Sequence, residues 1–469
     1  MRQIKNIHLV GIGGSGMGGI AEVLHYLGYN VTGSDVTNNA MVMHLKHIGI
    51  NIMVGHNANN IVDKDVLVVS SAISSDNVEL QEAHKLNVPI VQRAAMLSEL
   101  MRFKQGIAVA GAHGKTTTTS LIANIMAAGD HDPTFVIGGR VHGFGSNARL
   151  GSGNYFIVEA DESDASFLQL NPLVSVITNI EADHLENYDN DYEKLEKAYL
   201  EFIHKLPFYG FVVVCYDDPG VVKLLPEIAR PIVTYGLHSD ADYRIEFLER
   251  KDNQSHFIVH RKNNISMKIV LNLPGRHNIL NATAAIAVAT EEGISDTAIT
   301  KGLQNFTGVE RRMQNLGTIK VSGGTAVVID DYGHHPSEIK VVIESVREDF
   351  PNNRLVMLFQ PHRYSRTKVL FAAFAEHLAQ VDELLLLEVY PAGENYLPGA
   401  DSNALAVAIA TSHHNNLQPM VITELSQVTE LLQGVLQDGD VLLMQGAGNI
   451  GRLATEVVSR DAKIASVRS

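Results

Sequence analysis

The spacing of apolar and polar positions predicts strands alternating with helices from the start of the chain. Strands are predicted at 7–10, 30–32, 66–70 and 88–91, and a helical pattern covers 18–26. Short apolar runs bounded by glycine or polar residues are typical of buried parallel strands, and apolar positions three and four apart indicate helices. The first hundred residues are therefore expected to form a βαβ-type domain.

The middle of the chain continues this alternation and adds an antiparallel segment. Apolar runs at 106–110, 154–159 and 174–179 are predicted to be buried strands, and the last two end in polar residues. Residues 243–272 alternate polar and apolar positions, which favours an antiparallel hairpin with a turn at 261–264. Helices are predicted at 120–127, 191–204 and 278–292.

The last third repeats the pattern and completes a three-domain α/β prediction. Strands are expected at 326–329, 355–359, 383–387 and 441–445, with helices between most of them. A chain of 469 residues is too long for one core, because single cores stop growing near roughly 250–300 residues. The expected domains are 1–103, 104–308 and 309–469.

Composition narrows the classes of function. The net charge is −15 and no dense block of lysine and arginine interrupts it, which argues against nucleic-acid binding. Cys215 is the only cysteine, so an internal disulfide and a four-cysteine zinc site are excluded. No run approaches the roughly 18 apolar residues of a membrane span, and the first apolar stretch is too short for a signal peptide. We therefore expect a cytoplasmic protein.

Two glycine loops follow predicted strands. Gly11, Gly13 and Gly16 have the Gly-x-Gly-x-x-Gly spacing, and Asp35 follows the last of them by 19 residues. This arrangement is typical of a dinucleotide site whose acid binds a ribose, although a tight turn without a ligand has the same spacing. The loop at 446–451 repeats the pattern without a following strand or acid, and we interpret it as structural.

A third loop has the layout of a phosphate-binding turn. Gly111, Gly114, Lys115 and four threonines beginning at Thr116 stand between a predicted strand and a helix. Free N–H groups and the dipole at a helix start favour an anion, while the lysine reaches phosphates and a threonine hydroxyl binds Mg²⁺. The strict spacing fails, because Val109 stands where a glycine is usual. A glycine-rich turn without nucleotide is the alternative.

Acidic and basic residues follow the next two strands of the middle domain. The segment 159–164 carries four carboxylates, and Glu159 is the best candidate for a magnesium ligand. His184 follows the neighbouring strand and is a candidate for a second metal ligand. A solvated acidic loop and a packed histidine are the structural alternatives.

In the last domain, paired acids and paired histidines follow a strand. The segment 330–336 reads Asp-Asp-Tyr-Gly-His-His-Pro, which suits proton transfer or substrate binding. Arg363 and Arg366 suit the capture of a carboxylate or phosphate. A hydrogen-bonded turn and a basic surface turn are the alternatives.

Taken together and in order, these motifs resemble the Mur ligase family, and within it the branch that adds L-alanine. Ala112 departs from the family pattern, in which threonine is common; little effect is expected, because the backbone cradles the phosphates. The segments that carry the resemblance are 11–22, 111–117, 159–164, 178–184, 275–281, 331–336 and 360–363.

The resemblance implies a three-domain α/β architecture and a defined reaction. A Rossmann-like N-terminal domain would bind a UDP substrate, a P-loop-type central domain would bind ATP, and a Rossmann-like C-terminal domain would bring the amino acid. The enzyme would be a carbon–nitrogen ligase. It would join L-alanine to the lactyl carboxylate of UDP-N-acetylmuramate through an acyl phosphate, in cytoplasmic peptidoglycan precursor synthesis. It would use Mg²⁺, for which Mn²⁺ can substitute, and act as a monomer or weak homodimer, without nucleic-acid or membrane partners.

The resemblance also implies roles for individual residues. The UDP substrate would contact Gly11, Gly13, Gly14, Ser15, Gly16, Ser34, Asp35, Ser70 and Ser71. ATP would contact Gly111, Ala112, His113, Gly114, Lys115, Thr116 and Thr117, with His277 and Asn281 at the adenine and Arg312 and Asp331 reaching it from the third domain. The metal ligands would be Thr116, Glu159 and His184, and the alanine site would comprise Tyr332, His334, His362, Arg363 and Arg366. The catalytic set would be Lys115, Glu159, His184, Arg312 and His334.

Three other functions are compatible with parts of the sequence. A recycling ligase that joins a murein tripeptide to the same nucleotide shares the ATP motifs, although the opening at 13–16 favours the alanine enzyme. An NAD(P)-dependent oxidoreductase would use the two Gly-x-Gly-x-x-Gly loops but leaves the phosphate loop without a role. A nucleotide-binding switch that performs no catalysis is the third.

Overall fold

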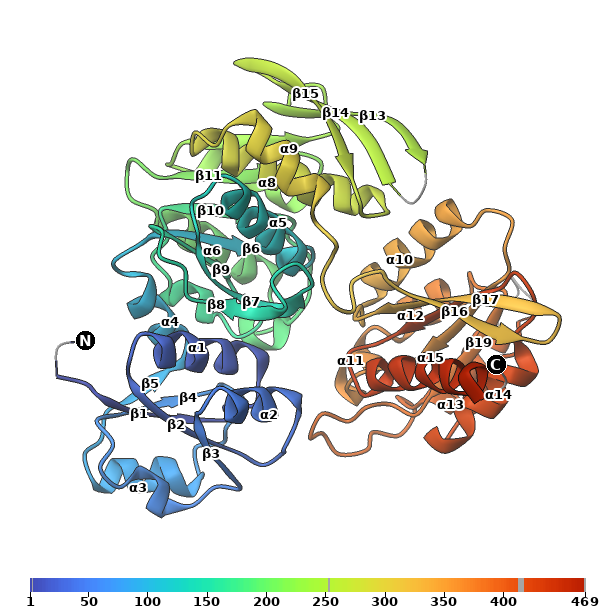
Figure 1. The fold of residues 1–469 in the computed structure, drawn as a ribbon, viewed down its shortest axis with the longest axis horizontal. Coiled ribbons are helices and arrows are strands. Elements are labelled where there is room, and N and C mark those ends of the chain that lie inside the picture. Colours follow the sequence, from blue (N-terminus) through green and yellow to red (C-terminus); the bar gives the residue numbers. More distant parts are fainter. Residues whose placement is uncertain (2, 252–253, 412–416, 468–469) are drawn as a thin grey trace. The chain divides into compact units, whose positions relative to one another are not determined.

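The computed structural model describes residues 1, 3–251, 254–411 and 417–467, and its contacts divide the chain into two compact units. The first unit comprises Met1–Leu273 with Asn278–Val309, and the second comprises Pro274–His277 with Glu310–Ser469. Figure 1 shows three sheets, of which the first unit contains two and the second contains one.

The first sheet is parallel, with five strands in the order β3-β2-β1-β4-β5. Its strands are β1 (Asn6–Val10), β2 (Asn30–Asp35), β3 (Asn51–Val54), β4 (Val66–Val69) and β5 (Ile90–Gln92). Its helices are α1 (Ser15–Tyr26), α2 (Ala40–His47), α3 (Val78–Lys85) and α4 (Arg93–Met101). The register pairs Val10 with Ser34, so the glycine loop after β1 lies beside the end of β2.

The second sheet has ten strands in the order β15-β14-β13-β12-β11-β10-β6-β9-β7-β8. The strands that come first along the chain are β6 (Gln105–Ala110), β7 (Thr134–Val141), β8 (Ser146–Arg149), β9 (Tyr155–Glu159) and β10 (Val174–Ile177). The later ones are β11 (Phe211–Cys215), β12 (Ile232–Gly236), β13 (Tyr243–Lys251), β14 (Gln254–Arg261) and β15 (Asn264–Leu271).

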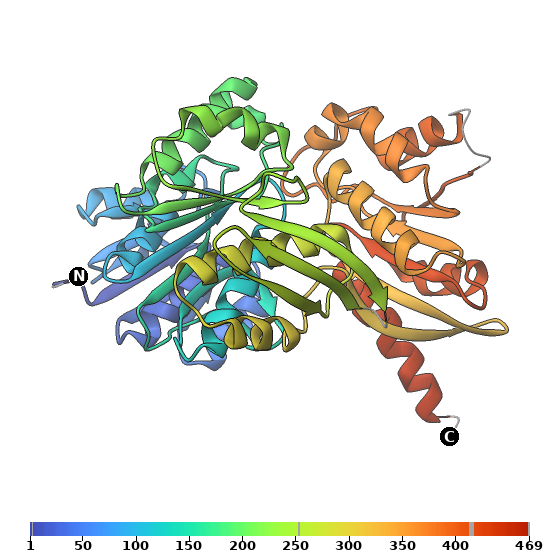
Figure 2. The same ribbon diagram turned by 90° about the horizontal axis from the view of Figure 1, so that it is seen from above.

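The expectation of a single hairpin over 243–272 was wrong. The segment forms three antiparallel strands, β13 to β15, which Figure 2 shows as long yellow-green arrows. The predicted turn is correct and joins β14 to β15, whereas residues 252 and 253, between β13 and β14, lie outside the described residues. Residues 249–256 are all polar, so the alternation stops there, and this signal of a break between two strands was missed.

Helices cover both faces of the parallel part of this sheet, and alternate side chains of β6 pack against the two helical layers. Ile107 and Val109 face one core, which contains residues of α5 (Lys115–Ala128), α8 (Arg276–Glu291) and α9 (Asp296–Gln304). Ala108 and Ala110 face the opposite core, which contains α6 (Tyr192–His204) and α7 (Pro219–Leu224). A strand buried on both faces reads as a continuous apolar run, as the sequence indicated.

The second unit contains a six-stranded sheet in the order β16-β17-β21-β18-β19-β20. The strands are β16 (Gln314–Val321), β17 (Gly324–Asp331), β18 (Leu355–Phe359), β19 (Glu383–Leu387), β20 (Met420–Ile422) and β21 (Val441–Gln445). One face packs against α10 (Pro336–Asp349), α12 (Phe371–Leu378) and α13 (Ser402–Thr411), and the other against α14 (Val428–Val435) and α15 (Ile450–Val467). The antiparallel edge strand β16 was not predicted, because its half-exposed residues show no apolar run.

The remaining helices are short. They are η1 (Ala58–Ile61), η2 (Ser166–Gln169), η3 (Leu185–Tyr188), η4 (Leu225–Glu227), α11 (Tyr364–Val369) and η5 (Leu425–Gln427). Within the part of the chain that the structure describes, no helix has both the length and the apolar character needed to cross a bilayer.

Candidate active site

The phosphate-type loop connects β6 to α5 and has room only for glycine at two positions. Gly111 and Gly114 have φ angles of 135° and 82°, which side chains rarely adopt. A Cβ on Gly114 would lie 2.5 Å from Asn281 Oδ1, and one on Gly111 would overlap the Thr178 hydroxyl. No side chain caps the start of α5. The N–H groups of its first turn therefore have the arrangement that binds an anion.

Residues at the end of β10 fasten this loop. The Thr178 hydroxyl and the Asn179 amide donate to the His113 carbonyl at 2.6 and 3.0 Å, and the His113 N–H donates to Asn179 Oδ1 at 2.8 Å. The His113 ring lies 3.2 Å from Glu181. These contacts fix the loop backbone, so Asn179 is a supporting residue that sequence reasoning did not single out.

The Lys115 amine is held by acceptors of the chain itself. It donates to the carbonyls of Gly111 and Ala112 at 2.5 and 3.1 Å, and to Glu162 Oε1 at 2.8 Å. Burial alone would lower the pKa of Lys115, but the carboxylates of Glu162 and Asp161 outweigh it and raise that pKa. The side chain thus remains a cation, as phosphate binding requires.

Glu162 is the acid of the 159–164 segment that turns toward Lys115. It is 5% exposed, and within the described residues its Oε2 atom has no hydrogen-bond partner. Burial raises the pKa of Glu162 to about 7, although the Lys115 ammonium opposes this shift. Unpaired buried carboxylate oxygens are costly, so a cation beside this atom would be stabilising. The residues around Glu162 in the sequence did not indicate that Glu162, and not Glu159, would contact Lys115.

Glu159 and His184, two of the three predicted metal ligands, have different neighbours. Glu159, the last residue of β9, accepts a hydrogen bond from the Gly138 N–H at 2.7 Å. His184 has a left-handed backbone, with φ of 55°, and lies 3.4 Å from Asp183 and 3.8 Å from Glu186. Their joint role at a metal stays a prediction.

The hydroxyl side chains at the start of α5 differ in their hydrogen bonds. The hydroxyls of Thr119 and Ser120 donate to helix carbonyls at 2.8 and 2.6 Å. Among the described residues, the hydroxyls of Thr116, Thr117 and Thr118 have no hydrogen-bond partner, and Thr118 is fully buried. The oxygens of Thr116 and Thr117 are therefore available to a ligand or metal.

In the first sheet, Asp35 braces the glycine loop. Its Oδ2 atom accepts from the Gly13 N–H at 2.9 Å, and the N–H groups of Gly11 and Ile12 donate to the Ser34 carbonyl. Asp35 Oδ1 accepts from Thr37. The acid thus supports the loop that a diphosphate would contact, and no side chain caps the start of α1 after Gly14.

Ser34 is buried in a polar cluster around Glu79. Its hydroxyl donates to Glu79 Oε2 at 2.5 Å, and His56 and Asn60 also contact the carboxylate at 3.0 and 2.5 Å. Burial alone would raise the pKa of Glu79, but hydrogen bonds from His8, Ser34 and Asn60 lower it to about 2. Ser34 therefore anchors the end of β2 in this state.

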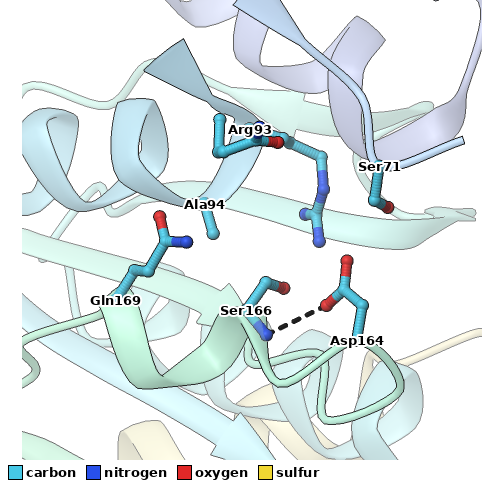
Figure 3. A pocket seen from close by; sticks show the side chains of 7 residues that line it. Ser71, Arg93, Ala94, Asp164, Ser166 and Gln169 are labelled. Carbon is cyan, nitrogen blue, oxygen red and sulfur yellow. Dashed lines mark hydrogen bonds between the residues drawn. The ribbon is translucent and has the colours of Figure 1, made fainter. Parts of the chain in front are cut away.

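Ser70 and Ser71 follow β4 at the same edge of the first sheet. The Ser70 N–H donates to the Val10 carbonyl at 3.3 Å, which keeps this loop beside the end of β1. Ser71 lines a cavity together with Arg93 of α4 (Figure 3). Arg93 was not among the predicted site residues.

In the second unit, Asp331 holds its own loop together. Oδ1 accepts from the Gly333 N–H at 2.7 Å and from the Gln445 amide at 3.0 Å, and Oδ2 accepts from the Met313 N–H at 2.9 Å. Burial raises the pKa of Asp331, and Arg312 opposes the shift. Its predicted contact with ATP stays a prediction.

Two guanidinium groups lie close to the Tyr332 ring. The Cζ atoms of Arg311 and Arg312 are 5.1 and 5.2 Å from the ring centre, which is cation–π geometry. Arg312 Nη1 also lies 3.6 Å from Glu338. These contacts orient Arg312 within the second unit.

The predicted alanine-site histidines contact each other. The His334 and His362 rings are 5.5 Å apart, and His362 stacks on Tyr390 at 5.4 Å. Burial and the nearby Arg366 lower the pKa of His334 to about 3 and that of His362 to about 4. Both imidazoles are therefore neutral at pH 7. Tyr390, in the loop after β19, was missed because no motif surrounds it.

Arg363 has a strained backbone at this site. Its φ of 70° lies in the left-handed region, and its N–H donates to the Tyr390 carbonyl at 2.9 Å. Such conformations cost about 1–3 kcal/mol and gather at functional sites. The strain sets the position of Arg363 beside His362.

The glycine loop at 446–451 is filled by the protein itself. A Cβ on Gly446 would lie 2.6 Å from the Gln360 carbonyl, and one on Gly448 would overlap the Gln360 side chain. The Gln360 amide donates to Asn449 at 2.8 Å, and Arg311 packs against Gly451. This agrees with the structural interpretation of the loop.

The two residues predicted for the adenine lie on α8. Asn281 packs against Gly114 in the first unit. His277 belongs to the second unit, where its Nδ1 atom lies 3.5 Å from the Ser345 hydroxyl. Their contact with a base stays a prediction.

Comparison with known families identifies the class of protein. Three family models match in order: the Mur ligase family catalytic domain over residues 6–105, the Mur ligase middle domain over 109–289, and the Mur ligase glutamate ligase domain over 311–448. The chain belongs to the Mur ligase family. Members are ATP-binding ligases of peptidoglycan synthesis, and the three-domain α/β architecture expected from the sequence is confirmed.

Two similar solved structures match nearly the whole chain, and a third matches two thirds of it. The UDP-N-acetylmuramate–alanine ligase MurC of Thermotoga maritima is 29% identical, with a TM-score of 0.83 over 98% of this chain and 99% of that one. A murein peptide ligase of Psychrobacter arcticus is 22% identical, with a TM-score of 0.73 over 97% and 98%. A UDP-N-acetylmuramate:tripeptide ligase of Neisseria meningitides is 27% identical, with a TM-score of 0.60 over 66% and 100%.

Proposed function

We propose that this chain joins L-alanine to the lactyl carboxylate of UDP-N-acetylmuramate in an ATP-dependent reaction. The observation that carries the proposal is the similarity to the alanine ligase of T. maritima along nearly the full length of both chains. The proposed domains are 1–103 for the UDP substrate, 104–308 for ATP and 309–469 for the amino acid. The tripeptide ligase is the second candidate, favoured by 27% identity to the N. meningitides enzyme over a shorter alignment.

The loop at 111–117 fits the phosphates of ATP. Gly111 and Gly114 let the loop pack closely against Thr178 and Asn281, where a Cβ would collide, and the first turn of α5 is uncapped. Lys115 would exchange its carbonyl and Glu162 partners for phosphate oxygens. Its ammonium would then offset the charge that builds up at the γ-phosphate.

The acidic strand ends fit a magnesium ion. Thr116, Glu159 and His184 are the proposed ligands, and the unpaired Oε2 atom of Glu162 adds a buried negative oxygen nearby. When bound, Mg²⁺ neutralises phosphate charge and orients the reacting groups. The chain's own contribution is to hold Glu159 at the end of β9 and His184 in the segment after β10, two strands that flank β6 in the sheet.

The reaction needs the carboxylate to be activated, because a carboxylate does not condense with an amine in water. A lactyl carboxylate oxygen would attack the γ-phosphorus, ADP would leave, and the acyl phosphate would then be attacked by the alanine amine with release of phosphate. Lys115 and Arg312 would stabilise the charge of the first step. Exclusion of water by the protein would protect the acyl phosphate from hydrolysis.

The second unit offers a fitting site for a small amino acid. Arg363 and Arg366 would bind the alanine carboxylate through guanidinium hydrogen bonds. His334 and His362 are neutral, so they would accept hydrogen bonds from the substrate without repelling its ammonium group. Tyr332 would close the site next to His334.

Further properties are proposed on the strength of family membership. The partners are the small-molecule substrates, the location is the cytoplasm, and the protein is a monomer or weak homodimer. Nucleic acid, a membrane and NAD(P) are not expected to bind. Sedimentation velocity and titration with NAD(P) would test the oligomeric state and the oxidoreductase alternative.

A coupled assay of ADP release tests the proposal. Purified protein with UDP-N-acetylmuramate is given L-alanine, glycine, L-serine or the murein tripeptide, and amide product is counted by mass spectrometry. Stoichiometric ADP and amide with L-alanine as the preferred amino acid are expected. Preference for the tripeptide would assign the recycling reaction, and ADP without amide would contradict a ligase.

A further inference from the structure

A small cavity lies in the first unit where the loop after β4 and the start of α4 face the loop after β9 (Figure 3). Its volume is about 200 Å³. Pockets for drug-sized ligands have volumes of roughly 300–1,000 Å³, so this cavity admits only part of a larger substrate. Six of the seven residues that line it have polar side chains; the lining consists of Ser71, Gln92, Arg93, Ala94, Asp164, Ser166 and Gln169.

Arg93 is a mostly buried cation with unused donors. Its side chain is 18% exposed, and its one ion pair in the described chain is a 3.5 Å contact between Nη2 and Asp161 Oδ2. Over the same residues its guanidinium makes no hydrogen bond shorter than this contact. A guanidinium carries five N–H donors, so those of Arg93 that solvent reaches are available to an incoming anion.

The Arg93 guanidinium packs against the first glycine loop. A Cβ on Gly16 would lie 3.3 Å from Arg93 Nη1, so the charge sits beside the first turn of α1. That helix has 12 residues, and Gly14 leaves its start without a side-chain cap. A cation beside uncapped helix amides favours an anion with several oxygens.

Asp161 is a weak partner that an incoming anion would replace. Its Oδ1 atom accepts from the N–H and hydroxyl of Ser163 at 3.1 and 2.7 Å, so only Oδ2 is turned toward Arg93. Asp161 also interacts with the charge of Lys115. Released from Arg93, its carboxylate would keep this second cationic neighbour.

We propose that Arg93 binds an anionic group of the nucleotide substrate in exchange for Asp161. Ser71, Gln92 and Gln169 provide hydrogen bonds to the polar groups next to that anion. The anion is the diphosphate or the sugar-linked carboxylate, which present the same oxygens to a guanidinium. The inference rests on the proposed function, because the class of substrate is taken from it.

Direct binding without ATP tests the assignment. Calorimetric titration of uridine, UDP, UDP-N-acetylglucosamine and UDP-N-acetylmuramate compares the natural chain with Arg93→Gln. We expect binding of the anionic ligand to weaken about 10- to 100-fold, the range for one charged hydrogen-bonded contact, and uridine binding to stay the same. Weakening for UDP and both nucleotide sugars identifies the diphosphate, and weakening for UDP-N-acetylmuramate alone identifies the carboxylate.

Two further variants sharpen the test. Arg102→Gln lies just after α4, where the exposed Arg102 pairs with Glu99, and it should bind all four ligands as the natural chain does. Asp161→Asn removes the competing carboxylate, so anionic ligands should bind several-fold more tightly. ADP binding by Arg93→Gln should be retained, which shows that the fold is intact.

The contrary results are distinct. Unchanged affinity of Arg93→Gln for every anionic ligand would overturn the inference, as would an equal loss for uridine and ADP. Tighter binding by Asp161→Asn supports the exchange, and unchanged or weaker binding contradicts it. Failure of the natural chain to bind any uridine nucleotide would refute the proposed function itself.

Discussion

The amine of Lys115 lies 2.8 Å from a carboxylate oxygen of Glu162, and the carboxylate is almost fully buried. The same amine donates to two carbonyls of the phosphate-type loop. The Lys115 amine is therefore bound by oxygen atoms of the protein, and phosphate oxygens would take their place. Lys115 and Glu162 are distant in the sequence, and only the folded chain brings them together. Their contact therefore marks the candidate site more specifically than either segment does by itself.

Lys115→Met should abolish most activity. Removal of one charge-stabilising donor costs about 10²–10³ in turnover, and the methionine keeps the buried aliphatic stem. ADP release with all substrates present is the measurement. Lys205→Met is the matched control, because Lys205 pairs with Glu201 on the surface of α6, and it should retain full activity. Near-normal phosphate release by Lys115→Met would remove this residue from the mechanism.

Glu159→Ala should raise the magnesium concentration needed for half-maximal activity by about tenfold, because a lost ligand or supporting carboxylate weakens a metal site by 10- to 100-fold. Activity is titrated against Mg²⁺ at saturating ATP. Glu201→Ala removes an exposed carboxylate of α6 and should leave the titration unchanged. A requirement identical to that of the natural chain would take Glu159 off the list of ligands.

Gly114→Ala should weaken nucleotide binding at least tenfold. The added methyl would lie 2.5 Å from Asn281 Oδ1, and alanine at φ of 82° costs about 1–2 kcal/mol in addition. Gly293→Ala is the control, because it has nearly the same φ, 77°, and no atom within 4 Å of the added Cβ. It should lose stability without losing nucleotide affinity. Equal losses of affinity in both variants would contradict a steric role for Gly114.

Much of the fold could be predicted because buried parallel strands have a local signature. Strand β6 alternates between two cores, yet all its residues except the first are apolar or glycine, so the run at 106–110 was recognisable. The loop that follows was recognisable as well, since a phosphate-type turn needs glycine and lysine at fixed positions. The half-exposed strand β16 has no comparable pattern.

The site could be predicted only as a set of segments. The segment 159–164 was identified, but which of its acids faces Lys115 depends on the loop after β9, and Glu162 rather than Glu159 makes that contact. Asp35 accepts a hydrogen bond from Gly13, which local spacing did not indicate, and its contact with a ribose stays a prediction. Arg93 belongs to none of the motifs. Its contact with Asp161 joins segments that are distant in the sequence, and such contacts cannot be predicted from the spacing of neighbouring residues.

His334→Gln should reduce amide formation by about tenfold at every pH between 5.5 and 9, with no shift of the acidic limb. Burial lowers the pKa of His334 to about 3, so the ring is neutral throughout this range and does not titrate. The measurement is kcat/KM for L-alanine against pH, with the exposed His47 changed to Gln as control. An acidic limb that moves in His334→Gln would show that this ring titrates during turnover.

Glu79→Gln should destabilise the first sheet at neutral pH and much less in acid. The pKa of Glu79 is about 2 in the folded protein and 4.5 for an ordinary glutamate. Its ionisation therefore contributes about 3 kcal/mol to the free energy of unfolding above pH 4.5. Below pH 4.5 the unfolded carboxylate takes up a proton first, and this stability falls as the pH approaches 2.

Hydrogen exchange of β1 and β2 amides at pH 7 and pH 3 measures the difference locally, because a multidomain chain does not unfold in two states. Glu82→Gln is the matched control on α3, where Glu82 pairs with the exposed Lys85, and it should change protection by less than about 1 kcal/mol. Equal effects of Glu79→Gln at both pH values would show that its contribution comes from packing and not from charge.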